Sequence, residues 1–240
     1  MSKRTARILI VDDEQDVVHI LHKSLVAQKY EVLIAHDGKN ALTLVEERQP
    51  DLMLLDINLP DLSGIEICRQ LRVRSQLPSI IVISIRNKER EKVRMLDAGA
   101  DDYIAKPFGI DEVLARVRVA LRHAAHITPA GSAVTLSLGP LIVDTAQHRV
   151  QLNGKEIKLT PTEYDLLLIF LRNQGKVLTQ RMLLTQIWGS EETTQSNYLH
   201  VYVAHLRRKL EPDPAHPRFF QTISGIGYRF TDSLEPEESE

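Results

Sequence analysis

The sequence predicts two domains: a doubly wound, parallel α/β domain followed by a smaller α+β domain. In the first half, short apolar runs alternate with amphipathic stretches, which is typical of βαβ units. Helical periodicity stops near His123, and the second half mixes short strand patterns with helices and ends in a hairpin pattern. A chain of 240 residues is also long for one domain and comfortable for two.

Five βα units account for the first half. The predicted strands are 7–11, 30–35, 51–55, 79–84 and 102–104. Each is followed by apolar residues at helical spacing, in the segments 14–28, 38–48, 63–75, 88–98 and 110–122. Units of this length favour right-handed connections and the flavodoxin-like strand order 2-1-3-4-5.

A segment without apolar periodicity and containing Pro, Gly and Ser follows the last predicted helix, which indicates a linker. The final residues are rich in acids, and this composition predicts a disordered tail. We therefore expect a first domain at 1–123, a linker at 124–134, a second domain at 135–232 and the acidic tail at 233–240.

The second domain begins with strand patterns at 141–144, 150–152 and 156–159, and Asn153-Gly154 indicates a type I′ turn between the last two. Thr160 and Glu163 form a capping box for a helix that ends near residue 173, and Thr179 caps a second helix up to Trp188. A third helix is expected at 196–210. Strands at 219–223 and 228–231 form the closing hairpin.

Bulk composition excludes several classes of protein. The single cysteine, Cys68, rules out an internal disulfide and zinc-finger spacing. No apolar run is long enough for a membrane span, and the amino terminus lacks the apolar core of a signal peptide, so we expect a cytoplasmic protein with no membrane partner. A net charge of −2 gives no global signal for nucleic acid.

Charged and polar residues follow four of the five predicted strands. They are Asp12, Asp13, Asp56, Ser84 and Lys106. A single acid after a strand is usually a helix cap or a turn residue. Parallel strands, however, end at the same edge of a sheet, where such folds bind their ligands. The joint occurrence of these residues therefore favours a functional site over separate caps.

This set of residues suits phosphoryl transfer. Carboxylates in one place repel each other, and Mg²⁺ removes that repulsion because it prefers oxygen ligands and phosphate oxygens. Lys106 would bind a phosphoryl group as a point charge, and Ser84 could donate a hydrogen bond to it. The chain has no Gly-rich phosphate loop, so a nucleotide is not the obvious ligand.

The predicted helix at 196–210 has one packed side. Leu199, Val203, Leu206 and Leu210 form an apolar stripe, and the opposite face is predicted to carry Asn197, Val201, Ala204, His205 and Arg208, with His200, Tyr202 and Arg207 on the flanks. A small, polar, cationic face suits a DNA major groove. An isolated helix of this kind would usually be an ordinary surface helix, but here a glycine-containing hairpin follows it, as in winged helices.

The segments Asp12-Asp13, Leu54-Leu55-Asp56, Ser84 and Gly99–Phe108 resemble the receiver domains of bacterial response regulators, and specifically the winged-helix OmpR/PhoB branch. Leu159–Glu163, Gly175–Arg181, Ile187-Trp188-Gly189 and Gly225–Phe230 are similar to the effector domain of that branch. The resemblance covers nearly the whole chain. It implies a winged helix-turn-helix domain, a sensor histidine kinase as phosphodonor, promoter DNA and RNA polymerase as partners, and no catalytic activity beyond the protein's own phosphorylation and dephosphorylation.

The resemblance also implies residue roles. Asp56 would accept the phosphoryl group, and Mg²⁺ would be held by Asp13, Asp56 and the backbone carbonyl of Asn58, with Asp12 acting through water. Lys106, after which the peptide bond to Pro107 would be cis, would bind the phosphoryl group. The switch residues would be Ser84 and Tyr103, and Arg229 of the closing hairpin would join the helix residues in contacting DNA. An activated homodimer would use a face containing Lys92, Asp97, Asp102, Glu112, Arg116 and Arg118.

Within this branch, segments 205–211 and 213–218 resemble the regulators of potassium-uptake (Kdp) operons. Two departures from the family pattern stand out. Ser224 replaces an arginine that many relatives use in the minor groove. Ile85 replaces a small residue next to Ser84, and its β-branched side chain predicts slower uptake from small phosphodonors.

We therefore predict a phosphorylation-activated, dimeric regulator of transcription that binds tandem half-sites, with a Kdp operon as its target. Three alternatives stay open at this point. One is the same kind of regulator acting on another regulon. The second is a phosphotransferase or phosphatase with Asp56 as nucleophile, which would need a substrate pocket. The third is a switch that acts through protein partners.

Overall fold

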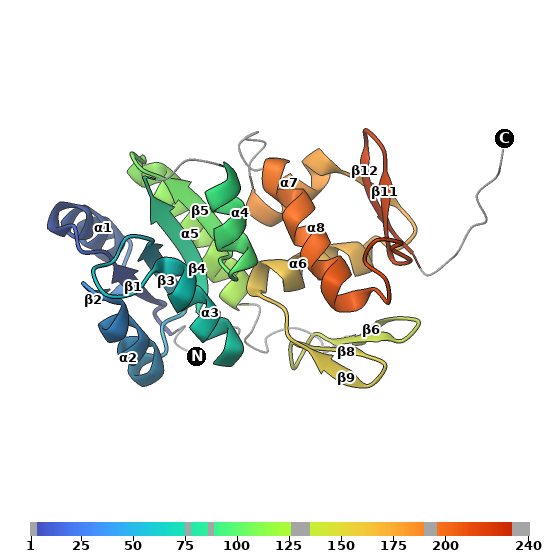
Figure 1. Cartoon of the computed structure of the whole chain (residues 1–240), viewed down its shortest axis with the longest axis horizontal. Helices are drawn as coiled ribbons and strands as arrows, with labels where there is room; N and C mark the ends of the chain where they lie inside the picture. Colours follow the sequence, from blue (N-terminus) through green and yellow to red (C-terminus); the bar gives the residue numbers. More distant parts are fainter. Residues whose placement is uncertain (1–3, 75–77, 86–88, 126–134, 190–195, 232–240) are drawn as a thin grey trace. The chain divides into compact units, whose positions relative to one another are not determined.

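The computed structural model describes residues 4–74, 78–85, 89–125, 135–189 and 196–231. The chain divides into two compact units, Met1–His126 and Ile127–Glu240, and each is described by itself (Figure 1). Within the described ranges, no helix is long and apolar enough to cross a membrane.

The N-terminal unit contains a five-stranded parallel sheet with the order β2-β1-β3-β4-β5, which confirms the predicted fold and strand order. Its strands are β1 Arg7–Val11, β2 Glu31–Ala35, β3 Leu52–Asp56, β4 Ser79–Ser84 and β5 Asp102–Ala105. The helices between and after them are α1 Gln15–Ala27, α2 Gly38–Arg48, α3 Gly64–Arg74, α4 Glu89–Asp97 and α5 Ile110–Ala125.

Helices cover both faces of this sheet, as the blue-to-green half of Figure 1 shows. On one face, α1 and α5 pack their apolar stripes on alternate residues of the central strands; Leu21 and Val117, for example, share a cluster with Ile10 and Leu54. Helices α2, α3 and α4 pack side by side. Each fully buried aliphatic side chain contributes about 1.5–3 kcal/mol, so the strand ends that carry the charged residues are firmly held.

Helix α5 continues to Ala125, three residues past its predicted end and two into the predicted linker. The added residues have no apolar periodicity, which is why the sequence placed the end earlier. Two of them are alanines, however, and alanine has the highest helix propensity. The remainder of the predicted linker and the acidic tail lie outside the described residues.

In the described part of the C-terminal unit, three helices lie between two small antiparallel sheets. The sheets have the orders β6-β7-β8-β9 and β10-β12-β11. Their strands are β6 Thr135–Leu138, β7 Leu141–Asp144, β8 Arg149–Leu152, β9 Lys155–Ile157, β10 Val177–Thr179, β11 Phe220–Ile223 and β12 Gly227–Phe230. The helices are α6 Pro161–Arg172, α7 Gln180–Trp188 and α8 Ser196–Leu210. The helices and the closing hairpin confirm the predicted winged-helix unit.

Two strands of this unit were not predicted. Thr135–Leu138 alternates polar and apolar residues but is short and follows directly on the linker pattern. Val177–Thr179 has only three residues and is held by antiparallel pairing with β12. A strand this short has little local signal, because its stability comes from its partner strand rather than from its own sequence.

The predicted helix starts are confirmed. Thr160 accepts a hydrogen bond from the backbone N–H of Glu163, and the Glu163 carboxylate accepts one from the backbone N–H of Thr160. Thr179 caps α7 in the same way through Met182 N–H. Asn153 and Gly154 both have positive φ, as the predicted type I′ turn requires.

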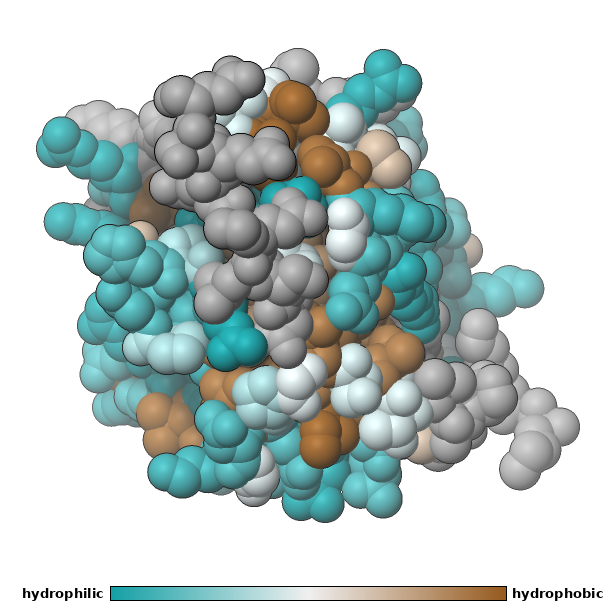
Figure 2. Space-filling view, turned by 90° about the vertical axis from the view of Figure 1, so that its right-hand side faces the viewer, coloured by the Kyte–Doolittle hydropathy of each residue, from teal (hydrophilic) through white to brown (hydrophobic). Residues whose placement is uncertain are grey.

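The closing hairpin fits closely against β10. A Cβ atom on Gly227 would lie 2.1 Å from the Leu178 carbonyl oxygen, so only glycine allows β12 to approach this strand. The hairpin tip presents Ile226, which is half exposed. Figure 2, which views the molecule from the right-hand side of Figure 1, shows mainly hydrophilic surface with hydrophobic residues in separate small groups.

Candidate functional site

Charged side chains converge at the carboxyl edge of the five-stranded sheet. Asp12 and Asp13 follow β1, Asp56 ends β3, Ser84 ends β4 and Lys106 follows β5. These positions are far apart in sequence, and the parallel sheet brings them together because all its strands end at this edge. Asp12, Asp56 and Ser84 are buried, whereas Asp13 is exposed.

Three carboxylates form a candidate metal site. One oxygen from each of Asp12, Asp13 and Asp56 lies within 4.8 Å of the other two. The backbone N–H of Asn58 donates to Asp56 Oδ1 at 2.9 Å, which holds the Asn58 peptide beside this cluster. All the donor atoms are oxygens, and two of the three acids are buried while Asp13 is exposed. Such a set fits a hard cation such as Mg²⁺, which keeps part of its water shell.

Lys106 offsets part of the negative charge of this cluster. Its Nζ donates to Asp56 Oδ2 at 2.7 Å, to Asp12 Oδ2 at 2.9 Å and to Glu14 Oε1 at 2.7 Å. Its side chain is only 8% exposed, so the pairs with Asp12 and Asp56 are shielded from solvent. The peptide bond between Lys106 and Pro107 is cis, as the family resemblance implied.

Burial and charge act in opposite directions on the pKa values of this site. Burial raises the pKa of Asp12 above its ordinary value, and the hydrogen bond from Lys106 offsets only part of that rise. Burial alone would lower the pKa of Lys106, but its hydrogen bonds to Asp56, Glu14 and Asp12 raise it. Lys106 therefore stays charged at physiological pH and provides a fixed positive group beside Asp56.

The turn after β3 helps to hold the Asp56 carboxylate in position. Oδ1 accepts the Asn58 N–H and Oδ2 accepts the Lys106 ammonium, so both oxygens have defined positions. Gly64 lies directly behind the turn, where a Cβ atom would come within 2.9 Å of the Ile57 Cα and 3.1 Å of the Asp56 carbonyl oxygen. A larger residue at position 64 would push the turn away from the sheet.

The predicted switch residues lie on the neighbouring strands. Ser84 is fully buried at the end of β4, and its carbonyl oxygen accepts the backbone N–H of Lys106 at 2.8 Å. Tyr103 on β5 is 5% exposed, and the ammonium of Lys92 lies 5.4 Å from the centre of its ring. Ile85, next to Ser84, is 66% exposed.

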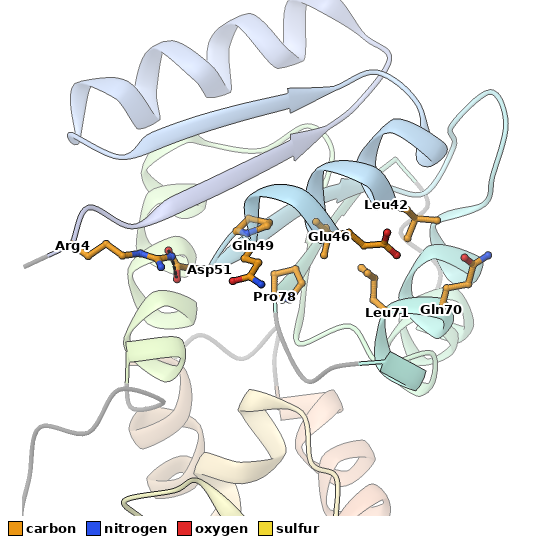
Figure 3. A pocket seen from close by; sticks show the side chains of 10 residues that line it. Arg4, Leu42, Glu46, Gln49, Asp51, Gln70, Leu71 and Pro78 are labelled. Atoms are coloured by element: carbon orange, nitrogen blue, oxygen red, sulfur yellow. Dashed lines mark hydrogen bonds and ion pairs between the residues drawn. The ribbon is translucent and has the colours of Figure 1, made fainter.

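One open groove lies away from the acidic cluster. It has a volume of about 420 Å³ and lies between α2 and α3, at the amino-terminal edge of the sheet. Figure 3 shows Arg4 and Asp51 paired at one end, with Leu42 and Leu71 facing each other from the two helices. Because Asp51 and Asp56 are at opposite ends of β3, this groove is not part of the charged site.

Helix α8 has more buried residues than its apolar stripe predicts. The predicted apolar stripe of Leu199, Val203, Leu206 and Leu210 is buried, which confirms that face. The exposed residues described on α8 are His200, Ala204 and Arg208, with Arg207 and Lys209 half exposed. Spacing of four residues places His200, Ala204 and Arg208 in one line along the helix.

Three residues expected on the open face of α8, or on its flank, are instead buried. Val201 is 5% exposed, Tyr202 packs its ring 5.4 Å from that of Trp188, and His205 lies 3.1 Å from a carboxylate oxygen of Glu163. The open face is therefore narrower than predicted, because Ala204 and Arg208 are exposed as expected but Val201 and His205 are not. Polarity alone misplaced His205, because the sequence does not show that its partner is a buried acid on α6. The side chain of Asn197 lies outside the described residues.

Glu163 connects α6 to α8, a role that sequence patterns did not indicate. Its carboxylate, 2% exposed, accepts the Thr160 N–H at 2.8 Å and the Lys209 ammonium at 2.6 Å, and it contacts His205. Burial alone would raise the pKa of Glu163, but these hydrogen bonds and the Lys209 charge outweigh it and lower the pKa. The cap of α6 therefore also fixes the position of α8.

A second buried acid organises the approach to the hairpin. Glu211, directly after α8, accepts the backbone N–H groups of Arg218, Phe219 and Phe220 at 2.8–2.9 Å. Arg207 donates to the Phe220 carbonyl at 3.0 Å. Arg229 of β12, predicted to contact DNA, donates to the side chain of Gln221 and is half buried.

Comparison with known proteins decides the family. Residues 8–118 match the response regulator receiver domain, and residues 154–230 match the C-terminal domain of transcriptional regulatory proteins. The chain is 47% identical over 223 residues to the KDP operon transcriptional regulatory protein KdpE of Escherichia coli K12, covering 93% of this chain and 98% of that protein. It belongs to the OmpR/PhoB family of response regulators.

Other relatives agree with this assignment. KdpE of Mycobacterium tuberculosis H37Rv is 43% identical over 93% of this chain and 98% of its own length. A solved structure of a RitR mutant matches with a TM-score of 0.77 at 28% sequence identity. DrrB, an OmpR/PhoB homologue of Thermotoga maritima, matches with a TM-score of 0.52 at 31% sequence identity. Both matches cover 95% of this chain and the whole of the other chain.

In this response regulator, several of the residues expected at a dimer face make contacts within the chain. Asp102 and Arg116 form an ion pair at 3.0 Å, and Arg116 also pairs with Glu112, one helical turn away, at 2.9 Å. Burial raises the pKa of Asp102, which the charge of Arg116 partly offsets. Asp97 and Arg118 are exposed, and Lys92 is buried beside Tyr103.

The structure adds three residues to those that sequence reasoning selected in this response regulator. They are Glu14 beside Lys106, Gly64 behind Asp56 and Glu163 beneath α8. Glu14 had a signal, because it extends the acidic run Asp12-Asp13. Glu163 was identified only as a cap. Its contacts with α8 depend on packing between residues 42 and 46 positions apart, which has no local pattern.

Proposed function

We propose that this response regulator accepts a phosphoryl group on Asp56 from the phosphohistidine of a sensor kinase. The observation that carries this proposal is the contact of the Lys106 ammonium with Asp56, beside a cluster of three carboxylates. Asp56 offers a fixed carboxylate oxygen as the nucleophile, and Lys106 lies where it can bind the transferred group. Positioning and charge neutralisation are the main demands of phosphoryl transfer.

Asp13, Asp56 and the backbone carbonyl of Asn58 would hold Mg²⁺, with Asp12 acting through water. The bound ion would offset carboxylate repulsion and the negative charge of the phosphoryl group. The chain's own catalytic role is limited to its phosphorylation and dephosphorylation. Ser84 would then bond the phosphoryl group, and Tyr103, which packs beside Lys92, would change position with it.

The phosphorylated protein would dimerise through a face that includes Lys92, Asp97, Asp102, Glu112, Arg116 and Arg118. Two linked DNA-binding units would then bind tandem half-sites, gaining affinity through effective concentration. On α8, the exposed line of His200, Ala204 and Arg208 is best placed to enter the major groove. Arg229 and the hairpin would contact the flanking backbone, and RNA polymerase would be the downstream partner.

A potassium-uptake operon of the Kdp type is the proposed target. Two relatives named KdpE share 43–47% identity over almost their full length, including the DNA-binding unit. Within that unit, the segments 205–211 and 213–218 also carry the resemblance to regulators of Kdp operons. A gel shift on DNA upstream of the host's own potassium-pump genes, with unrelated promoter DNA as competitor, tests this target. Equal binding to both DNAs would reject it.

Asp56→Asn tests the phosphoacceptor. We expect it to abolish labelling by a sensor kinase or acetyl phosphate, while weak DNA binding remains, because the C-terminal unit has its own core. Labelling is followed on phosphate-affinity gels and DNA binding by fluorescence anisotropy. Asp16→Asn, which removes an exposed acid on α1, is the matched control. Wild-type labelling of Asp56→Asn would contradict the proposal, and turnover of small phosphoesters would favour the enzyme alternative.

A further inference from the structure

Glu14 is a third partner of Lys106, and it has no role in the proposed phosphoacceptor chemistry. Its Oε1 lies 2.7 Å from Lys106 Nζ, a contact as short as that between Lys106 and Asp56. An ammonium group has three hydrogens to donate. In this structure Asp12, Asp56 and Glu14 accept all three, so Lys106 has no free donor for a phosphoryl oxygen.

Glu14 is the partner most easily displaced. The side chains of Asp12 and Asp56 are 3% and 5% exposed, so losing the ammonium would leave their charges buried. Glu14 is 58% exposed, and water can replace its partner at little cost. A phosphoryl group on Asp56 would therefore gain its bond from Lys106 by taking the place of Glu14.

The local structure supports a role for Glu14 outside its own helix. Glu14 is the N-cap residue of α1, yet its side chain accepts no backbone hydrogen bond from that helix. Glutamate is also not among the residues favoured at this position. Its backbone N–H is fixed by Asp12 Oδ1 at 2.9 Å, which directs the residue toward the acidic cluster rather than toward the helix axis.

We propose that Glu14 is a positioning residue that holds Lys106 in the unphosphorylated protein and slows phosphorylation by competing with the incoming phosphoryl group. This inference rests on the proposed role of Asp56. In the reaction with acetyl phosphate, a carboxylate oxygen of Asp56 forms a bond to phosphorus while the bond from phosphorus to the acetate oxygen breaks, and acetate leaves with that electron pair. Lys106 exchanges Glu14 for a phosphoryl oxygen during this step.

Two variants distinguish competition between Glu14 and the phosphoryl group for Lys106 from a general effect of charge on the labelling rate. Glu14→Gln removes the charge at nearly constant shape, and Glu14→Asp keeps the charge on a side chain one methylene shorter. Acetyl phosphate should label both variants about two- to fivefold faster than wild type, because an exposed ion pair contributes only a small free energy. Asp16→Asn removes a nearby exposed charge that is not in contact with Lys106 and should leave the rate unchanged.

Labelling is measured on full-length protein with phosphate-affinity gels, and Mg²⁺ affinity by calorimetry with Mg²⁺ alone. The inference requires faster labelling with an unchanged Mg²⁺ dissociation constant. It is overturned if Glu14→Gln is labelled at the wild-type rate, if only Glu14→Gln and not Glu14→Asp is accelerated, or if Mg²⁺ affinity changes in parallel with the rate. If wild type is not labelled on Asp56 at all, the proposed function itself fails, which is a distinct outcome.

Discussion

At the scale of single residues, the charged site depends on which groups are shielded from water. Lys106 contacts three carboxylates from two segments of the chain, and two of those carboxylates are almost fully buried. An exposed ion pair contributes only about 0–1 kcal/mol. A buried one leaves an uncompensated charge when either partner is removed. The same residue type therefore has different consequences at Asp12, Asp56 and Glu14.

Ile85 gives a prediction at this scale. It is 66% exposed and follows Ser84, which lies at the end of β4 beside the phosphoacceptor edge. A β-branched side chain there narrows the approach of a small phosphodonor, so Ile85→Ala should be labelled faster by acetyl phosphate. Val73→Ala removes a comparably exposed apolar side chain on α3 and serves as the control. Equal rates for wild type and Ile85→Ala would reject the steric explanation.

At the scale of elements, α8 is positioned by contacts that hold three of its polar side chains. His205 and Lys209 both contact the Glu163 carboxylate on α6, and Arg207 bonds the Phe220 carbonyl. These three residues are therefore partly or wholly occupied within the unit. Arg208 is exposed on the line with His200 and Ala204, and it is the cation that we propose to contact DNA.

Arg208→Ala should weaken DNA binding by about 1–3 kcal/mol if it contacts a base, without changing phosphorylation or thermal stability. Lys155→Ala, which removes an exposed cation from β9, is the control. Anisotropy titrations and labelling assays measure the two properties separately. Unchanged DNA affinity for Arg208→Ala would show that the exposed face of α8 is not the DNA-reading face.

Glu163 predicts a pH dependence of stability. Because the folded pKa of Glu163 lies below its unfolded value of 4.5, its ionised contacts stabilise the protein fully above pH 4.5, and this contribution is lost as the pH falls through the lower folded value. Glu163→Gln should therefore lower Tm at neutral pH, with a cost of about 3–5 kcal/mol as for other broken buried pairs. The difference from wild type should shrink below pH 4.5.

Thermal melts followed by circular dichroism, at neutral pH and below pH 4.5, test this expectation. Glu156→Gln is the control, since Glu156 is an exposed acid in β9 that pairs with Arg149 at 3.3 Å. It should change Tm little at either pH. A Tm difference for Glu163→Gln that stays constant across the acid range would mean that the charge of Glu163 is not what stabilises the unit.

At the scale of the whole molecule, function requires two units with separate cores to act together. The proposed phosphoacceptor Asp56 lies in the N-terminal unit, whereas the helix proposed to contact DNA lies in the other unit. In the proposed function a symmetric dimer would connect them, because joining two DNA-binding units raises the effective concentration of the second one at a neighbouring half-site. Under this proposal, phosphorylation would act by shifting a monomer–dimer equilibrium.

Arg118→Glu tests this coupling. Arg118 is exposed on α5, away from the acidic cluster in sequence. The variant should be phosphorylated at the wild-type rate but should not dimerise in sedimentation velocity, and it should lose the affinity gain on DNA with tandem half-sites. Binding to a single half-site should be unchanged. A phosphorylated dimer of Arg118→Glu with full affinity would exclude this residue from the interface.

The sequence by itself determined the doubly wound sheet, the strand order and the convergence of Asp12, Asp56, Ser84 and Lys106, because parallel strands all end at one edge. It also determined the capping box at Thr160, because a capping box is a local pattern.

Only the tertiary structure decided which side of α8 is exposed and which carboxylates share Lys106. His205 and Arg208 look alike as polar residues on one helix, yet one is buried against Glu163 and the other faces solvent. Burial depends on which distant segment packs against a residue, and no periodicity within the helix records that partner.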